Sequence, residues 1–143
     1  MILMMVERQL RDLDRAESLR RLASVPVGRV VFTWRALPAI RPVNHVVDGD
    51  DVIIRTHLGA ALLAAGEAGM VVAYEADELD LDARRGWSVV AVGPARLVEP
   101  AETGRYAALL RPWVDGPMDQ VVRIHCDIVN GYELVDAVTG TAP

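Results

Sequence analysis

Polar side chains suited to holding a small ligand gather at the open ends of one predicted hairpin. Residues 41–47 (Arg-Pro-Val-Asn-His-Val-Val) and 52–56 (Val-Ile-Ile-Arg-Thr) are rich in β-branched residues and flank an Asp-Gly turn. Gly49 tolerates a positive φ, so the turn fixes the register of the two strands. Asn44 and the Arg55-Thr56 pair then lie at neighbouring strand ends, where their donors can converge on a small anionic or heteroaromatic molecule. Polar hairpin ends are also common as purely structural features, so the site needs support from the rest of the chain.

The sequence contains no known catalytic or metal-binding motif. The histidines lack the spacing of metal ligands, no serine lies in a GxSxG turn, and no glycine run reads GxGxxG. The single cysteine, Cys126, excludes a CxxC unit and an internal disulfide framework, and we expect it to be buried. We therefore expect no metal site and assign no catalytic residue. A shaped polar site without acid–base side chains depends on a cofactor for its chemistry.

The charged residues exclude several function classes. Lys and Arg together number 15, and every one of them is arginine. Without lysine there is neither a Schiff-base amine nor a phosphate-loop NTPase motif. A net charge of −5 with scattered arginines argues against a nucleic-acid partner. No apolar run approaches the roughly 20 residues of a membrane-spanning helix, and residues 1–5 lack the features of a signal peptide. We expect a cytoplasmic protein with no membrane partner.

A mostly antiparallel sheet must position the hairpin. Leucines at roughly helical spacing predict an N-terminal helix over about residues 12–23, which ends before Pro26. Strands are predicted near residues 28–34, 38–47, 51–56, 70–75, 87–98, 120–128 and 132–135, with a bulge or bend at Gly93-Pro94 and the last two strands joined around Asn130-Gly131. Short helices are predicted near residues 57–65 and 101–110, and an exposed acidic segment over 77–82. The pattern indicates a mainly β fold, a barrel with flanking helices, in one domain over 1–143 with the barrel at about 28–136.

Several segments, in this order, resemble one known family. They are Val25-Pro-Val-Gly28-Arg29-Val-Val-Phe, Arg41-Pro-Val-Asn44-His45, Asp48-Gly-Asp-Asp-Val-Ile-Ile-Arg55-Thr56, Gly86-Trp87-Ser88-Val89-Val90, Val122-Arg-Ile124 and Gly131. From about residue 10 to residue 135 the chain resembles the pyridoxamine 5′-phosphate oxidase-like, FMN-binding split-barrel proteins. The resemblance implies a six-stranded antiparallel split barrel that forms a homodimer, with FMN bound in clefts between the protomers.

The resemblance also implies a set of cofactor-binding residues. Residues 41–44 would face the isoalloxazine edge largely through backbone groups, Arg55 and Thr56 would bind the phosphate, and Trp87 and Ser88 would line the same cleft. The full set is Arg41, Pro42, Val43, Asn44, Arg55, Thr56, His57, Ala61, Trp87 and Ser88. Each has a structural alternative: Arg55 as a surface ion-pair partner and Trp87 as a packing residue of the core or of a dimer.

One position departs from the family pattern. Many relatives carry lysine within Gly-Thr-Lys-Leu, where residues 59–62 here read Gly-Ala-Ala-Leu, so Ala61 occupies the basic position. A lost charge-assisted contact costs about 1.5–3 kcal/mol unless the N-terminus of the following helix and Arg55 compensate.

Two functions therefore stay open. The leading one is a flavin-dependent oxidoreductase that passes electrons from a reduced nicotinamide through FMN to a small substrate, for example a nitroaromatic compound. The alternative is a non-catalytic dimer that binds or senses a flavin, a deazaflavin or a haem. A third possibility is a ligand-free dimer kept for protein contacts.

Overall fold

The computed structural model describes residues 8–56, 61, 69–110 and 120–136, and eight of its strands form one antiparallel sheet. The strands are β1 (Arg8–Leu13), β2 (Val27–Trp34), β3 (Leu37–Asp48), β4 (Asp51–Thr56), β5 (Met70–Asp80), β6 (Arg85–Leu97), β7 (Gln120–His125) and β8 (Ile128–Asp136), and the helices are α1 (Arg15–Ala23) and α3 (Pro100–Ala107). The predicted helix over 57–65 lies almost wholly outside the described residues.

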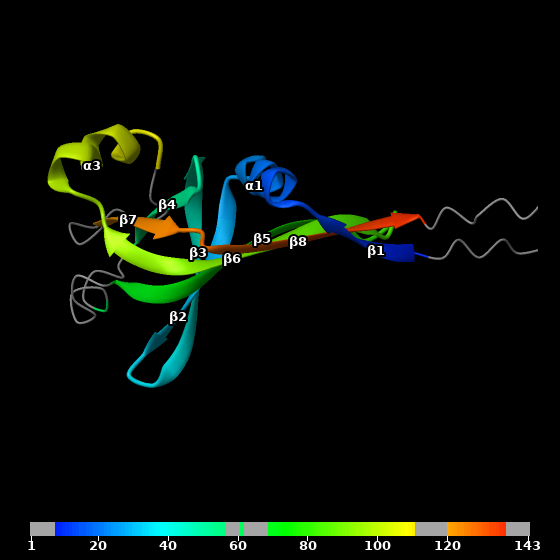
Figure 1. Ribbon diagram of the computed structural model, residues 1–143, viewed down its shortest axis with the longest axis horizontal. Coiled ribbons are helices and arrows are strands. Elements are labelled where there is room, and N and C mark those ends of the chain that lie inside the picture. The colour runs from blue at the N-terminus through cyan, green and yellow to red at the C-terminus, as the bar shows by residue number, and fades with distance from the viewer. Residues whose placement is uncertain (1–7, 57–60, 62–68, 111–119, 137–143) are drawn as a thin grey trace, which may run out of the picture.

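Six of the strands close into a barrel because β6 is long enough to pair with three neighbours. The sheet order is β1-β8-β6-β5-β2-β3-β4-β7, and the additional β6–β7 pairing joins the ends of the six strands from β6 to β7. β5 pairs along almost the whole of β6, whereas β7 pairs with its last residues and β8 with its first. β1 and β8 extend the sheet beyond the barrel (Figure 1). The predicted six-stranded antiparallel barrel with flanking helices is confirmed.

Alternating strand residues and one face of α1 fill the barrel core. Val30, Tyr74 and Val89 are fully buried there, and Leu22 of α1 belongs to the same cluster. α1 begins at its N-cap Asp14, whose carboxylate accepts a hydrogen bond from the Glu17 N–H at 2.8 Å. The helix therefore presents its leucines to the core immediately before β2 begins.

A second cluster lies outside the barrel, where α3 covers β4 and β7. Ile53 and Val121 of these strands pack there with Tyr106 and Leu110 from α3 and the turn after it. The Tyr106 hydroxyl donates to an Asp48 carboxylate oxygen at 2.6 Å, which ties α3 to the β3–β4 turn. β4 is thus buried on both faces, and α1 and α3 lie on the same side of the molecule (Figure 1).

Several predicted boundaries were wrong. Residues 8–12 form most of β1, so the N-terminal helix begins only at Arg15. Asn130-Gly131 is not a turn: it lies inside β8, and the β7–β8 connection falls at residues 126–127. Gly131 is needed there because a Cβ would collide with the Ser18 hydroxyl of α1. Much of the acidic segment, residues 77–80, continues β5.

The predicted bulge at Gly93-Pro94 is also absent, since β6 pairs with β5 in unbroken register from residue 85 to 95. Gly93 serves a different purpose, because a Cβ there would collide with the His125 carbonyl oxygen at the end of β7. Cys126 is fully buried, as predicted, and burial raises the pKa of its thiol to about 11, which makes it a poor nucleophile at neutral pH.

Candidate ligand site at the split of the barrel

β3 changes its hydrogen-bonding partner in the middle of the predicted site. Its first part pairs with β2 up to Asn44, and its second part pairs with β4 from His45 onward. Beyond the His45–Ile54 pair no further β3–β4 pairs form among the described residues, so the two strands separate there. The β3 edge over residues 41–44 therefore faces a split whose other side is the end of β4.

The structure brings Asn44 and Arg55 to the same place. Each is the next residue beyond the His45–Ile54 pair on its own strand. Alternation along the strands turns both side chains outward, and both are half-buried. Val43 and Thr56, one step further along, turn toward the barrel interior and are buried. The side chains predicted to contact one ligand thus lie on two different faces.

Arg41 and Pro42 lie on the exposed part of β3 next to the split. The Arg41 guanidinium lies 5.9 Å from the centre of the Phe32 ring and donates a hydrogen bond to the Ile40 carbonyl at 2.9 Å. These two contacts hold the Arg41 guanidinium at the mouth of the split, and among the described residues no carboxylate forms an ion pair with it.

Arg55 and Gln120 are the polar groups at the β4 end of the site. Arg55 Nη1 donates to the Leu110 carbonyl at 3.3 Å, which orients its guanidinium along the outer face. Gln120, which pairs with Thr56 across β4 and β7, has a buried side-chain Oε1 with no hydrogen-bond partner among the described residues. A buried acceptor without a partner is costly unless a donor reaches it. An oriented guanidinium, a buried acceptor and the strand edge over residues 41–44 together fit a ligand that carries both an anion and N–H or O–H donors.

The remaining predicted site residues lie elsewhere. His57 is outside the described residues, and Ala61 is buried. Trp87 and Ser88 are on β6, and because β2 and β5 run between β3 and β6, about three strand spacings, roughly 14 Å, separate them from Asn44. One copy of the chain therefore does not bring Trp87 and Ser88 to the split. Whether they share its ligand stays a prediction.

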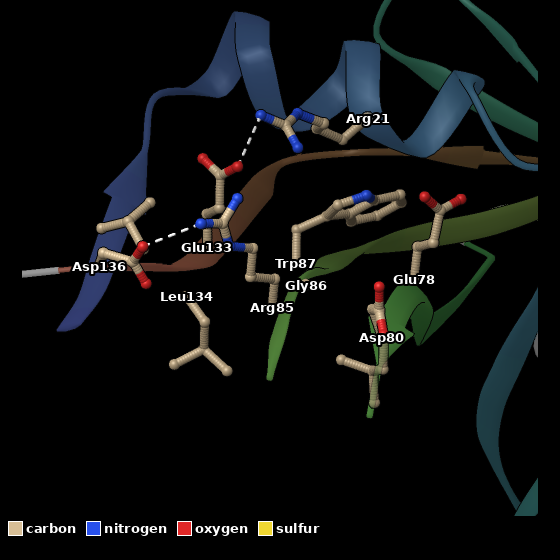
Figure 2. Close-up of a pocket in the computed structure, with 11 residues that line it drawn as sticks. Arg21, Glu78, Asp80, Arg85, Gly86, Trp87, Glu133, Leu134 and Asp136 are labelled. Carbon is tan, nitrogen blue, oxygen red and sulfur yellow. Dashed lines mark hydrogen bonds and ion pairs between the residues drawn. The ribbon is translucent and has the colours of Figure 1, made fainter. Parts of the chain in front are cut away.

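Trp87 instead lines a hollow of about 380 Å³ where β5, β6 and β8 leave the barrel (Figure 2). Arg21 and Arg85 lie on its walls, and each is bonded to a carboxylate of β8, Arg21 to Glu133 at 3.1 Å and Arg85 to Asp136 at 2.8 Å. Both arginines among the described lining residues therefore have their charge balanced by a neighbouring carboxylate. The sequence did not indicate this hollow, because its walls come from distant segments.

The sequence also did not indicate a buried polar pair behind the split. His45 Nε2 lies 2.7 Å from the Leu22 carbonyl oxygen, and His45 Nδ1 lies 2.5 Å from the Tyr74 hydroxyl. Burial lowers the pKa of His45 below its usual value and raises that of Tyr74, so both are neutral at pH 7. No local sequence pattern points to Tyr74, because its partner His45 is 29 positions away in the chain.

The outer sheet face, the surface of β2, β5, β6, β8 and residues 37–44 of β3 that points away from the core, carries one charged cluster. Arg29 Nη1 lies 3.6 Å from a Glu75 carboxylate oxygen and 3.8 Å from one of Asp77. Burial and the neighbouring Asp77 raise the pKa of Glu75 to about 7. Neither described helix covers this face, and Val71 on it is 68% exposed.

Two general features complete the geometry. No helix in the described part of the chain is long and apolar enough to cross a membrane. Among the same residues, no three His, Cys, Asp or Glu side chains lie close enough together to hold a metal ion.

Comparison with known proteins places this geometry in a family. A family model described as pyridoxamine 5′-phosphate oxidase matches residues 14–133. The uncharacterized protein Rv0080 of Mycobacterium tuberculosis is 53% identical over 133 residues, which span 90% of this chain and 88% of that protein. The FAD binding protein of Mycobacterium smegmatis is 29% identical, with a TM-score of 0.63 over 87% of this chain and 98% of its own.

A second protein of Mycobacterium smegmatis, the FAD and heme binding protein, shares the fold at 17% identity, with a TM-score of 0.59 over 82% of this chain and 70% of its own. The overall fold of this chain is thus shared with two solved structures that are named as flavin-binding proteins. The family model matches the chain from the start of α1 into β8, and the chain therefore belongs to the pyridoxamine 5′-phosphate oxidase family.

Proposed function

We propose that the split between β3 and β4 binds FMN and that the protein is a flavin-dependent oxidoreductase. The observation that carries the proposal is that Asn44, Arg55 and the β3 edge over residues 41–44 converge at the point where the β3–β4 pairing ends among the described residues. The Mycobacterium smegmatis FAD binding protein, with 29% identity and nearly full coverage, supports a flavin as the ligand. FAD is the direct competitor of FMN, because both present the same ring and a first phosphate.

The proposed roles follow from the chemistry of each group. The backbone groups of residues 41–44 would bind the polar edge of the ring, and Arg55 would bind the phosphate, with the Thr56 N–H or hydroxyl beside it. Gln120 Oε1 would accept a hydrogen bond from the ligand, which would satisfy its lone pairs. When bound, the flavin would supply the redox chemistry, taking a hydride or electrons from a reduced nicotinamide and passing them to a small substrate. The protein would supply position and electrostatics.

We further propose that the protein works as a homodimer that pairs through the outer sheet face. Arg29 beside the two acidic side chains makes this face self-complementary, since a two-fold axis can set each arginine against the carboxylates of the other copy. Exposed apolar side chains surround the cluster, among them Ile40, Val71 and Ile128. Ser88 also points out of this face, so a second copy could bring it to the split.

A second candidate function is a non-catalytic flavin, deazaflavin or haem carrier. Ala61 favours it, because the buried alanine cannot supply the cation that many relatives place there. The fold is shared with a protein that binds both FAD and haem. Weak flavin binding without turnover would support this candidate.

Titration of the purified protein with FMN, FAD, a deazaflavin and haem, followed by gel filtration, tests the proposal. We expect FMN or FAD to co-elute with a band near 450 nm and Arg55→Ala to weaken flavin binding by about ten- to a hundredfold, the value of one charge-assisted hydrogen bond. Arg20→Ala is the matched control, since it removes an exposed arginine of α1.

The outcomes separate the functions. Oxidation of a reduced nicotinamide by the flavin-loaded protein supports an oxidoreductase. Retention of flavin or haem without turnover supports a carrier. If the wild-type protein retains none of the four ligands, or if Arg20→Ala weakens binding as much as Arg55→Ala does, the proposed site is wrong.

A further inference from the structure

The buried pair of Tyr74 and His45 has a fixed hydrogen-bond direction. A carbonyl oxygen can only accept, so His45 Nε2 carries the proton that is donated to Leu22 O at 2.7 Å. In a neutral imidazole Nδ1 is then an acceptor, and the Tyr74 hydroxyl, 2.5 Å away, donates to it. The chain of donors runs from β5 through β3 to the end of α1.

This chain meets β3 at the residue where the barrel splits. His45 is the first residue of β3 to pair with β4, and its backbone N–H donates to the Pro26 carbonyl at 3.0 Å. Its side chain and backbone therefore bind three separate segments: the last turn of α1, the residue before β2, and β5. Because the peptide group is planar, the hydrogen bond from the His45 N–H also orients the Asn44 carbonyl in the same peptide plane.

The absence of a side chain at Gly28 leaves room for the Tyr74 hydroxyl. A Cβ at Gly28 would lie 2.6 Å from the Tyr74 hydroxyl and 2.6 Å from the Glu75 carbonyl oxygen, so β2 passes the ring without a side chain. Tyr74 is fully buried and His45 is 4% exposed. A phenylalanine would fill the same volume without needing an acceptor, whereas the hydroxyl here contacts both His45 and the Val43 carbonyl, at 3.4 Å.

We propose that Tyr74 and His45 are positioning residues of the flavin site, which hold the β3 edge at a fixed orientation to Arg55 through the hydrogen bonds from Tyr74 to His45 and from His45 to Leu22. This inference rests on the proposed flavin site. The pair does not touch the ligand. It acts by limiting movement of residues 43–45, and a site whose edge is already in place binds its ligand without the cost of ordering that edge.

Two tyrosine variants test the inference. Tyr74→Phe removes only the hydroxyl and leaves His45 Nδ1 without its donor. Tyr106→Phe is the matched control, because Tyr106 is also buried and its hydroxyl donates to Asp48 outside the barrel. Two quantities are measured on each protein: the dissociation constant of FMN from fluorescence quenching, and hydrogen exchange of the His45 backbone amide in the ligand-free protein.

We expect Tyr74→Phe to bind FMN roughly five- to tenfold more weakly and to exchange the His45 amide faster by a similar factor, as loss of one buried hydrogen bond predicts. Tyr106→Phe should leave both quantities within about twofold of the wild type. The imidazole ¹⁵N signals should report the Nε2–H tautomer in the wild type and shift in Tyr74→Phe.

The inference is overturned if Tyr74→Phe changes neither FMN affinity nor His45 exchange, or if Tyr106→Phe changes both as much. Failure of the proposed function is distinguishable, because then the wild-type protein binds no flavin at all. In that case faster His45 exchange in Tyr74→Phe alone would still show that the pair orders the split, whereas unchanged exchange would reject the pair's role.

Discussion

At the scale of single residues, the protein holds neutral polar groups where water cannot reach them. His45 is the clearest case, because its two ring nitrogens are both hydrogen-bonded and its protonated form is disfavoured by burial. The same ring lies beside the proposed ligand site. Its protonation state therefore affects both the stability of the fold and the shape of the split.

Stability should fall in mild acid because of His45. Its pKa is lower in the folded protein than in the unfolded chain, so between those two values the unfolded chain binds more protons and the free energy of unfolding decreases as pH falls. The loss begins below about pH 6.5 and is complete at the folded pKa.

Urea unfolding of the wild type and of His45→Gln from about pH 7.5 to about pH 5 measures this effect. The wild type should lose more stability than the variant over this range. The raised pKa of Glu75 makes the folded protein more stable as pH falls, which is the opposite effect, but Glu75 is present in both proteins and its effect cancels in the comparison. Equal slopes would show that His45 is not the residue responsible.

Gly28 is expected to be intolerant of any side chain. Gly28→Ala places a methyl group 2.6 Å from a backbone oxygen and from the Tyr74 ring, and such overpacking costs about 1–3 kcal/mol. Gly104→Ala in α3 is the control: a Cβ there meets nothing within 4 Å, and alanine should stabilise that helix by about 0.5–1 kcal/mol. Thermal unfolding of both variants checks the opposite signs. Destabilisation by both would contradict the steric explanation.

At the scale of elements, the β2–β3 turn contains strain. Trp34 pairs with Leu37, so only Arg35 and Ala36 form the loop, and their φ angles are 53° and 64°. Two positive φ values are typical of a type I′ turn, which favours Asn-Gly. A side chain in this left-handed region costs about 1–2 kcal/mol.

Ala36→Gly should therefore raise the free energy of unfolding by about 0.5–1 kcal/mol, the relieved strain less the greater entropy of glycine in the unfolded chain. The midpoint of denaturant unfolding measures it. Ala101→Gly, in the first turn of α3, has no such strain to relieve and should be neutral or destabilising. An increase in both variants would contradict the argument.

Elements whose patterns are local could be predicted from the sequence, and those that depend on distant partners could not. The β-branched runs around Gly49 gave β3, β4 and their turn. Residues 8–13 carry leucines at helical spacing and form a strand only because they pair with β8, which the sequence does not reveal. Asn130-Gly131 has turn composition, but its glycine is required by the approach of α1.

The candidate site divides in the same way. Asn44 and Arg55 could be predicted to lie together, because one short turn sets the register of the strands that carry them. Trp87 could not be placed relative to them, since that depends on β2 and β5 running between β3 and β6. Tyr74 of β5 and Gly28 of β2 lie close together on neighbouring strands, and no local sequence pattern indicates that they do.

At the scale of the whole molecule, the outer sheet face should control assembly. Val71→Asp places a charge among the apolar residues proposed to meet a second copy, and burial of an unpaired charge should raise the dimer dissociation constant by at least roughly tenfold. The monomer should keep its stability, because the side chain is 68% exposed before assembly.

Sedimentation velocity over a range of concentrations measures the change in assembly. Leu81→Asp is the control, since Leu81 is 85% exposed in the turn after β5 and outside this face. If Val71→Asp assembles like the wild type, or if Leu81→Asp dissociates equally, the second copy does not use the outer sheet face.

The pairing of β1 with β8 has a consequence for synthesis on the ribosome. Arg11 of β1 and Glu133 of β8 are ion-paired although they are 122 positions apart in the sequence. β1 is synthesised before the other described strands, whereas β8, its only strand partner among the described residues, is synthesised after them. β1 therefore has no strand to pair with until β8 has been synthesised, and we expect the β1–β8 pairing to form late in folding. Three of its six residues are charged (Arg8, Arg11 and Asp12), and the strand is short, so it should resist aggregation while it is unpaired.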